Sequence, residues 1–332
     1  MPAARRLSEL GLKARQGRDP VLSGLTLDSR AARAGMLFAA LPGSARHGAE
    51  FIATALEQGA AAILTDTAGA ALAVEALAAS DAALVVADDP REALAYAAAL
   101  WFGAQPPVMV GVTGTNGKTS VATFTRQIWQ ALGHSAINIG TTGIEGDWAA
   151  PSSHTTPDTI TLQRLLADAA AAGVTHAAME ASSHGLEQRR LEGVRLAAAG
   201  FTNLTQDHLD YHGTMEAYFQ AKAGLFDRLL PPEGVAVINL DGAKGSAMAE
   251  RALDRGLAVM TVGKGQGADL QIAATRADAT GQEVRYLWQG RAFQTRLNLI
   301  GAFQAENVAL AAGLAIAAGE TPEAVLSALP RL

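Results

Sequence analysis

The chain has 332 residues, no cysteine, and a net charge of −6 from 32 acidic and 26 basic side chains. A domain usually takes roughly 100–200 residues, so we expect two domains. The acidic balance argues against a nucleic-acid-binding surface, and the lack of cysteine excludes disulfides, zinc-thiolate sites and thiol catalysis. No segment approaches the roughly 20 apolar residues that span a bilayer, and no secretory signal opens the sequence. We therefore expect a cytoplasmic protein without a membrane or nucleic-acid partner.

The first hundred residues alternate strand-like apolar runs with helix-like stretches, which is typical of a parallel sheet with crossover helices. Predicted strands lie at 36–41, 61–64 and 83–87. Predicted helices lie at 49–59, through the 70s, and from Pro90 to about 102. Proline suits the first turn of that last helix, and the segment 103–107 with its two prolines reads as a linker.

Beyond the linker the alternation resumes, which predicts a second α/β unit with a mostly parallel, doubly wound sheet. The predicted strands lie at 108–112, 136–139, 176–179, 197–202 and 235–239. Between 269 and 300 the side chains alternate in polarity, with turn signals at Gly281-Gln282 and Gln289-Gly290, which favours an antiparallel addition to the sheet. Helices at 121–132, 303–318 and 322–329 complete the predicted set.

The strongest local signal is a glycine-rich turn between the strand at 108–112 and the following helix. Glycines stand at 111, 114 and 117, and Lys118-Thr119 follows at the helix start. Such a turn lets backbone N–H groups approach phosphate oxygens, while the lysine reaches the β- and γ-phosphates and the threonine hydroxyl holds Mg²⁺. The common spacing would place glycine at Val112. The alternative is a tight turn with a solvated lysine, which the coincidence of these features disfavours.

Acidic and histidine side chains follow two later strands. Glu180 directly follows the strand predicted at 176–179 and so lies at the sheet edge where doubly wound proteins bind ligands. Its carboxylate is a suitable ligand for Mg²⁺. The segment 207–212 holds two acids and two histidines, and Lys222 lies in a helical pattern ten residues beyond His212. On composition alone Lys222 is a solvated helix lysine, and 210–212 is a polar surface loop.

These motifs together resemble the Mur ligases, the ATP-dependent amide-forming enzymes of peptidoglycan assembly and cell wall biogenesis. The segment 113–119 resembles the phosphate loop of that family, which explains the unusual glycine spacing. Further matches at 27–30, 154–157 and 180–190 are typical of the members that add the third residue of the stem peptide. The segment 207–212, with Lys222 downstream, agrees with them.

The resemblance implies a role for each matching residue. ATP would contact Gly114, Thr115, Asn116, Gly117, Lys118, Thr119, Ser120 and, on the adenine side, Asn307. The UDP end of the substrate would contact Leu27, Ser29, Ser44, Ala45 and Arg46. The muramoyl-dipeptide would contact His154, Thr155, Thr156, Ser182, Gln188 and Arg190. His154 departs from the asparagine of some members.

The resemblance also implies the metals and the reaction. Thr119 and Glu180 would serve one Mg²⁺, and His208 with Lys222 a second. CO₂ would carbamylate Lys222 and so turn a cation into a metal-ligating carboxylate. The D-glutamate γ-carboxylate would attack the γ-phosphate of ATP, giving an acyl phosphate that an incoming amine then attacks. Lys118, His208 and Lys222 would be the catalytic side chains, with Lys118 and the metals neutralising charge on the transferring group.

The family's domain plan makes 1–104 the UDP-substrate domain and 105–332 the ATP-binding domain. A third domain of the family selects the added amino acid through an Asp-Asn-Pro-Arg type motif that this sequence lacks. We therefore expect a chain without that domain and a poor ligase as it stands. Whether meso-diaminopimelate or L-lysine is added cannot be read from the sequence; meso-diaminopimelate is the commoner case in the family and is the residue we expect. We also expect a monomer.

Two other functions remain open on the sequence. A folylpolyglutamate synthetase uses the same chemistry, although Lys118-Thr119 and the 28–30 motif argue against it. A phosphate-loop regulatory or binding module without ligase activity is the second alternative.

Overall fold

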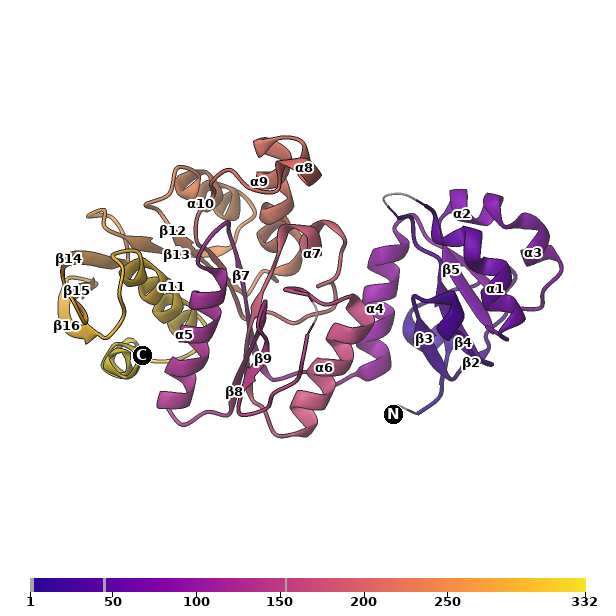
Figure 1. Cartoon of the computed structure of the whole chain (residues 1–332), viewed down its shortest axis with the longest axis horizontal. Coiled ribbons are helices and arrows are strands. Elements are labelled where there is room, and N and C mark those ends of the chain that lie inside the picture. Colours follow the sequence, from indigo (N-terminus) through magenta and orange to yellow (C-terminus); the bar gives the residue numbers. More distant parts are fainter. Residues whose placement is uncertain (1–2, 44–45, 153) are drawn as a thin grey trace. The chain divides into compact units, whose positions relative to one another are not determined.

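The computed structural model describes residues 3–43, 46–152 and 154–332, which form two compact units (Figure 1). The first unit contains the chain up to Ala104 and the second begins at Gln105, within the predicted linker. Two short segments that the sequence assigned to the second domain, 158–167 and 188–193, cluster with the first unit instead. No helix among the described residues is long and apolar enough to cross a membrane.

The first unit is built on a four-stranded parallel sheet. Its strands, in the order in which they pair, are β3 (Gly24–Thr26), β4 (Met36–Ala39), β5 (Ala62–Thr65) and β6 (Ala83–Val86). Side chains alternate between the two faces of a strand, so Leu37 joins a core with Leu94 while Phe38 joins another with Ile52. Helices therefore cover both faces of this sheet, as the α/β pattern predicts.

The helices of the first unit are short, apart from the last one. They are α1 (Ile52–Glu57), α2 (Thr67–Leu72), α3 (Val74–Ala78) and α4 (Pro90–Phe102). The Asp89 carboxylate caps α4 by accepting from two backbone N–H groups of its first turn, and Pro90 takes the first helical position as predicted. The helix predicted at 49–59 begins instead as a 3₁₀ turn, Gly48–Phe51, and the predicted helix of the 70s is split at Ala73.

The second unit contains a ten-stranded sheet, which confirms the predicted fold class of a mostly parallel sheet with an antiparallel addition. The central strands run parallel in the order β14 (Leu270–Asp278), β13 (Ala258–Gly263), β12 (Val235–Asn239), β11 (Ala198–Phe201), β7 (Val108–Thr113), β10 (His176–Glu180) and β8 (Ala136–Gly140). Antiparallel strands extend both edges, with β15 (Gly281–Trp288) and β16 (Arg291–Leu297) beyond β14, and β9 (Gly143–Gly146) beside β8.

Two long helices of the second unit lie side by side over the sheet (Figure 1). They are α5 (Lys118–Ala131) and α11 (Gln304–Ala317). A Cβ on Gly200 would meet a Leu314 methyl group at 3.0 Å, so glycine allows α11 to approach the sheet closely. The remaining helices of the second unit are α7 (Ser183–Glu187), α8 (Leu209–His212), α9 (Met215–Gly224), α10 (Gly245–Asp254) and α12 (Pro322–Ala328). The helix α6 (Thr159–Ala171) lies mostly in the segment that clusters with the first unit.

Several elements of the second unit differ from the sequence prediction. The helix α5 begins at Lys118 rather than residue 121, so the phosphate loop ends directly in its first turn. Gly281 and Gln282 are the first residues of β15 and not a turn, because the chain reverses at residues 279–280. The strand β13 was not predicted at all. The turn at Gln289-Gly290 is confirmed, with φ of 49° and 81° as a tight hairpin requires.

Candidate active site

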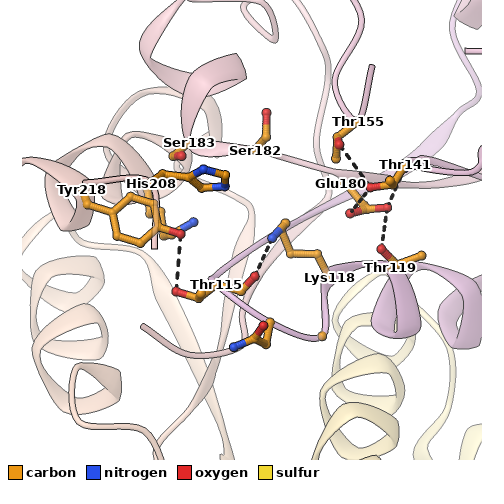
Figure 2. Close-up of a pocket in the computed structure, with 13 residues that line it drawn as sticks. Thr115, Lys118, Thr119, Thr141, Thr155, Glu180, Ser182, Ser183, His208 and Tyr218 are labelled. Carbon is orange, nitrogen blue, oxygen red and sulfur yellow. Dashed lines mark hydrogen bonds between the residues drawn. The ribbon is translucent and has the colours of Figure 1, made fainter. Parts of the chain in front are cut away.

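A cavity of about 330 Å³ lies in the second unit where β7, β10 and β8 end (Figure 2). Ligands of doubly wound proteins bind at this carboxyl edge of the sheet. The residues that line it are Thr115, Asn116, Gly117, Lys118, Thr119, Thr141, Thr155, Glu180, Ser182, Ser183, His208, Tyr218 and Lys222. The phosphate-loop segment and the side chains predicted to hold metals therefore share one cavity.

Neighbouring side chains approach the phosphate loop so closely that two of its positions require glycine. Gly114 has φ 141°, and a Cβ there would overlap the Thr202 hydroxyl. Gly117 has φ 88°, and its Cβ would lie 2.5 Å from Asn307 Oδ1. Asn203 also holds the loop, because its carbonyl oxygen accepts from the N–H of Thr115 at 2.9 Å. The loop conformation is thus fixed from two sides, and Asn307 contacts the loop backbone.

The Lys118 ammonium lies over the loop. Its Nζ donates to the carbonyl oxygens of Gly114 at 3.0 Å and Thr115 at 2.7 Å. Burial lowers the pKa of Lys118, and the nearby carboxylates of Glu180 and Asp207 oppose that shift. Since α5 begins at this residue, the unpaired N–H groups of its first turn face the same loop, which makes a binding site for anions.

The Glu180 carboxylate is buried, with 1% of the residue exposed, and is held by two threonines. Its Oε1 accepts from the Thr119 hydroxyl and from the Thr141 N–H, both at 2.9 Å (Figure 2). A side chain at Gly140 would overlap this carboxylate, so glycine is required at the end of β8. The hydroxyl and carboxylate oxygens form the hard donor set that Mg²⁺ prefers.

Lys222 is buried rather than solvated, which corrects the bland interpretation of its sequence context. Only 1% of the residue is exposed, and its Nζ donates to the carbonyl oxygen of Gly114 at 2.7 Å. The Nζ also lies 4.2 Å from the ring centre of Tyr218. Burial, together with the charge of Lys118, lowers the pKa of Lys222 to about 6. At neutral pH its side chain is therefore mostly an uncharged amine.

His208 reaches the cavity from the start of α8. Its backbone is in the left-handed region with φ 50°, and its N–H donates to Asp207 Oδ1 at 2.9 Å. Its ring Nε2 lies 3.4 Å from the other Asp207 oxygen, and its centre lies 5.1 Å from that of His184. The structure thus brings His208 to the same cavity as Lys222, with which the resemblance pairs it.

The predicted dipeptide-binding residues divide between the two units. Thr155 lines the cavity and lies 3.1 Å from Thr141, oxygen to oxygen, and Ser182 lies beside the buried Thr156 hydroxyl at 3.0 Å. His154 is exposed on the same segment. Gln188 and Arg190 belong to the segment that clusters with the first unit, where the Arg190 guanidinium donates to Gln188 Oε1 at 2.7 Å.

A second cavity, of about 650 Å³, lies in the first unit at the ends of β3 and β4. Its lining includes three of the predicted UDP-contacting residues, Leu27, Ser29 and Arg46. The Asp28 carboxylate accepts from the Arg30 N–H at 2.9 Å and so shapes the turn that presents the first two. The other two residues of the prediction, at positions 44 and 45, lie outside the described residues.

Comparisons with known proteins agree with this geometry. Residues 112–315 match the Mur ligase middle domain, and residues 21–101 match the catalytic domain of the Mur ligase family. The chain belongs to the Mur ligase family. A relative from Caulobacter vibrioides, UDP-N-acetylmuramoyl-L-alanyl-D-glutamate--2,6-diaminopimelate ligase, is 47% identical over 321 residues. That alignment covers 95% of this chain and 64% of the relative, so the chain spans just under two thirds of the relative's length.

Solved structures of Mur ligases and related enzymes show the same fold. A UDP-N-acetylmuramoyl-L-alanyl-D-glutamate--2,6-diaminopimelate ligase structure matches 100% of this chain and 67% of its own, with a TM-score of 0.84 and 31% identity. A Mycobacterium tuberculosis folylpolyglutamate synthase complexed with ADP covers 74% of this chain and 62% of its own, with a TM-score of 0.60 and 20% identity. At that identity the second likeness concerns the fold alone.

The cavity of this Mur ligase chain includes three side chains that the sequence prediction missed. Thr141 directly follows β8, Ser183 follows the predicted Ser182, and Tyr218 precedes Lys222 by one helical turn. The i, i+4 spacing of Tyr218 and Lys222 places both on one helix face, so this signal was available in the sequence. Thr141 could have been found as a polar residue at the carboxyl end of a predicted parallel strand.

Proposed function

We propose that this chain carries the nucleotide-sugar and ATP sites of a cytoplasmic ligase of peptidoglycan precursor synthesis. The reaction would join 2,6-diaminopimelate to UDP-N-acetylmuramoyl-L-alanyl-D-glutamate. The observation that carries the proposal is the single cavity in which Lys118, the Thr119–Glu180 pair and the buried Lys222 meet. The activity in the name of the Caulobacter vibrioides relative, which is 47% identical, supports the substrate and the diamino acid.

The phosphate loop would hold ATP through residues 114–120, with Asn307 beside them. ATP supplies the γ-phosphate that activates the substrate carboxylate as an acyl phosphate. Lys118 already lies over the loop, and its ammonium would turn from the carbonyl oxygens to phosphate oxygens. Its positive charge would then offset the charge that develops on the transferring group, in a cavity where partial burial strengthens the interaction.

Thr119 and Glu180 would hold one Mg²⁺. The Thr119 hydroxyl already lies 2.9 Å from Glu180 Oε1. A bound cation would also neutralise the charge of the buried carboxylate, which is costly to leave unpaired. The metal would supply electrostatic stabilisation of the phosphate oxygens. Thr141 would keep the carboxylate in place through its backbone N–H.

His208 and Lys222 would hold a second Mg²⁺ once Lys222 is carbamylated. An uncharged amine can attack the carbon of CO₂, forming an N–C bond and releasing one proton to solvent. The low pKa of Lys222, about 6, supports this step because the amine is available at neutral pH. The product is a carboxylate-like group, which replaces a charge that would repel the metal with one that attracts it.

The cavity of the first unit would take the UDP end of the substrate through Leu27, Ser29 and Arg46. The muramoyl-dipeptide would contact His154, Thr155, Thr156, Ser182, Gln188 and Arg190. The planar guanidinium of Arg190 suits bidentate pairing with the dipeptide carboxylate.

Substrate-dependent phosphate release tests this function. The chain is incubated with ATP and Mg²⁺, with and without UDP-N-acetylmuramoyl-L-alanyl-D-glutamate, and hydroxylamine is added to trap an acyl phosphate as a hydroxamate. We expect phosphate and hydroxamate only with the nucleotide-sugar. ATP hydrolysis that is indifferent to this substrate, together with no binding of it by calorimetry, would favour a phosphate-loop module without ligase activity. Stimulation by folate instead would favour the folylpolyglutamate synthetase alternative.

A further inference from the structure

Three potential metal ligands meet at the opposite end of β10 from the candidate active site. His176 begins this strand and Glu180 ends it. The ligand atoms of His134, His176 and Glu320 all lie within 4.8 Å of one another. His134 Nε2 is 2.7 Å from Glu320 Oε1, and the ring centres of the two histidines are 4.2 Å apart. Among the described residues, no other three His, Asp or Glu side chains bring their potential ligand atoms this close together.

The backbone places two of these side chains by the same device. Gly133 follows the end of α5 with φ 91°, and Gly319 follows the end of α11 with φ 114°. Each left-handed glycine reverses the chain, so His134 and Glu320 come next to the last turns of two 14-residue helices. The C-terminal end of a helix dipole carries partial negative charge, so two such ends near the group favour a bound cation.

The third ligand is held by a neighbour, as ligating histidines usually are. His176 is buried, with 8% of the residue exposed, and its Nδ1 lies 2.8 Å from the Thr175 hydroxyl. A partner on Nδ1 fixes the ring orientation and leaves Nε2 as the ligand atom. Burial and the adjacent His134 also lower the pKa of His176 to about 4, so the ring is uncharged at neutral pH.

We propose that His134, His176 and Glu320 form a binding site for a zinc-type divalent transition-metal ion. Two imidazole nitrogens and one carboxylate oxygen are a ligand set for zinc, with water as the fourth ligand, whereas Mg²⁺ prefers oxygen alone. Tetrahedral bonds of about 2.0–2.1 Å put ligand atoms roughly 3.3 Å apart, so small side-chain rotations satisfy the site. His134 and Glu320 are partly exposed, at 35% and 20% of their side chains, which leaves a path for the ion.

A simple ion pair between His134 and Glu320 is the competing explanation. It accounts for two of the side chains but gives the third, the adjacent His176, no role. A metal would use all three. It would also join the C-terminal ends of α5 and α11 to the start of β10, and those three elements carry Lys118, Asn307 and Glu180 toward their other ends. The bound ion is therefore expected to stabilise the second unit.

Zinc titration of the metal-depleted chain tests the site. After treatment with a chelator, ZnCl₂ is added in competition with a chromogenic chelator, and the number of sites and their Kd are compared among variants. The test variants are His134→Gln and Glu320→Gln. The matched control is His47→Gln, because His47 Nε2 also lies 3.1 Å from a carboxylate, that of Asp66, in a pair within the first unit. Binding to histidines elsewhere is common to all these chains and cancels in the comparison.

We expect the unaltered chain and His47→Gln to bind one more Zn²⁺ than either test variant, or to bind it with a Kd at least about tenfold lower. Zn²⁺ should also raise the Tm of the unaltered chain more than that of the test variants. Equal stoichiometry and equal Kd in all four chains would overturn the proposal. Far-UV circular dichroism checks that the variants fold, and since Glu320 lies in a surface turn, Glu320→Gln decides the matter if His134→Gln does not fold.

Discussion

Lys118 and Lys222 donate to the same acceptor, the carbonyl oxygen of Gly114, at 3.0 and 2.7 Å. Two ammonium groups on one carbonyl repel each other, and both side chains are removed from water. Burial lowers the pKa of both lysines, that of Lys222 to about 6; Asp207 opposes the shift at both, and Glu180 opposes it at Lys118. In the proposed function, Lys118 would be the phosphate-binding cation and Lys222 the uncharged amine that carbamylation needs.

The first prediction concerns folding stability between pH 6 and about 10.5. In this range an unfolded chain holds a proton on Lys222 that the folded chain has released, because the pKa of Lys222 is about 6 in the folded chain and the ordinary pKa of a lysine is 10.5. A fall in pH favours the state that binds more protons, which is the unfolded chain. The folding stability that depends on an uncharged Lys222 is therefore fully present above pH 10.5 and is lost as the pH falls toward 6. The free energy of unfolding should therefore rise with pH by up to about 1.4 kcal/mol per pH unit from this group.

Urea unfolding from pH 6.5 to 9 in CO₂-free buffer measures this slope. Lys222→Met should have a flatter pH dependence than the unaltered chain, while Lys13→Met, at an exposed lysine, should keep it. The same slope in all three chains would mean that Lys222 is not the titrating group.

The second prediction separates the two binding sites. Lys118→Ala should abolish ATP turnover, because it removes the cation over the phosphate loop. Binding of the UDP-sugar should remain largely intact, since the cavity lined by Leu27, Ser29 and Arg46 lies in the other unit. Calorimetry with UDP-N-acetylmuramoyl-L-alanyl-D-glutamate and a phosphate-release assay measure the two properties. If the variant loses both while its circular dichroism is unchanged, the assignment of the two ligands to separate units is wrong.

The third prediction concerns the carbamate. Lys222→Ala should be inactive in substrate-dependent phosphate release, and a short-chain carboxylic acid should partly restore it by placing a carboxylate in the vacated space. Lys118→Ala is the control, because an added anion cannot replace its positive charge. Absence of rescue at every acid concentration tested would count against a carboxylate-like group at Lys222.

Local patterns were enough to predict the elements that position the site. The run of apolar residues before Gly114 and the Lys118-Thr119 pair predicted the strand, the loop and the helix that the structure contains. Glu180 was predicted at the correct edge because parallel strands present their carboxyl ends together. These features depend on neighbours in the sequence, so the sequence alone carries them.

The environment of the site could not be predicted, because it depends on which strands pair. β8 pairs with β10, with Ile139 opposite Met179, and only that pairing brings Thr141 to the Glu180 carboxylate. The burial of Lys222 likewise depends on a contact with Gly114, 108 positions away in the sequence. A helical pattern describes one helix and does not state what will cover it, so a solvated lysine was the natural but incorrect interpretation.

The last prediction concerns Gly114, where backbone conformation and space both exclude a side chain. Gly114→Ala introduces a Cβ at φ 141°, a region that costs side-chain-bearing residues about 1–3 kcal/mol, and the new methyl group overlaps the Thr202 hydroxyl. Overpacking adds about 1–3 kcal/mol. The matched control is Gly173→Ala, because Gly173 has φ 88° with nothing within 4 Å of its Cβ position, so only the backbone cost of about 1–2 kcal/mol applies.

Thr202→Ala separates the two contributions at Gly114. The buried Thr202 hydroxyl has no hydrogen-bond partner among the described residues, so its removal alone should cost little. In the Gly114→Ala background, Thr202→Ala should recover the loss that the overlap with the hydroxyl causes, giving a favourable coupling of about 1–3 kcal/mol in a double-mutant cycle. The backbone cost should remain, and so should the crowding of the Asn203 N and O atoms, which would lie 3.0 Å from the new Cβ. Urea unfolding of the four chains measures the coupling. Additive effects would mean that the loop yields to the methyl group, and that Thr202 does not fix the position of the phosphate loop.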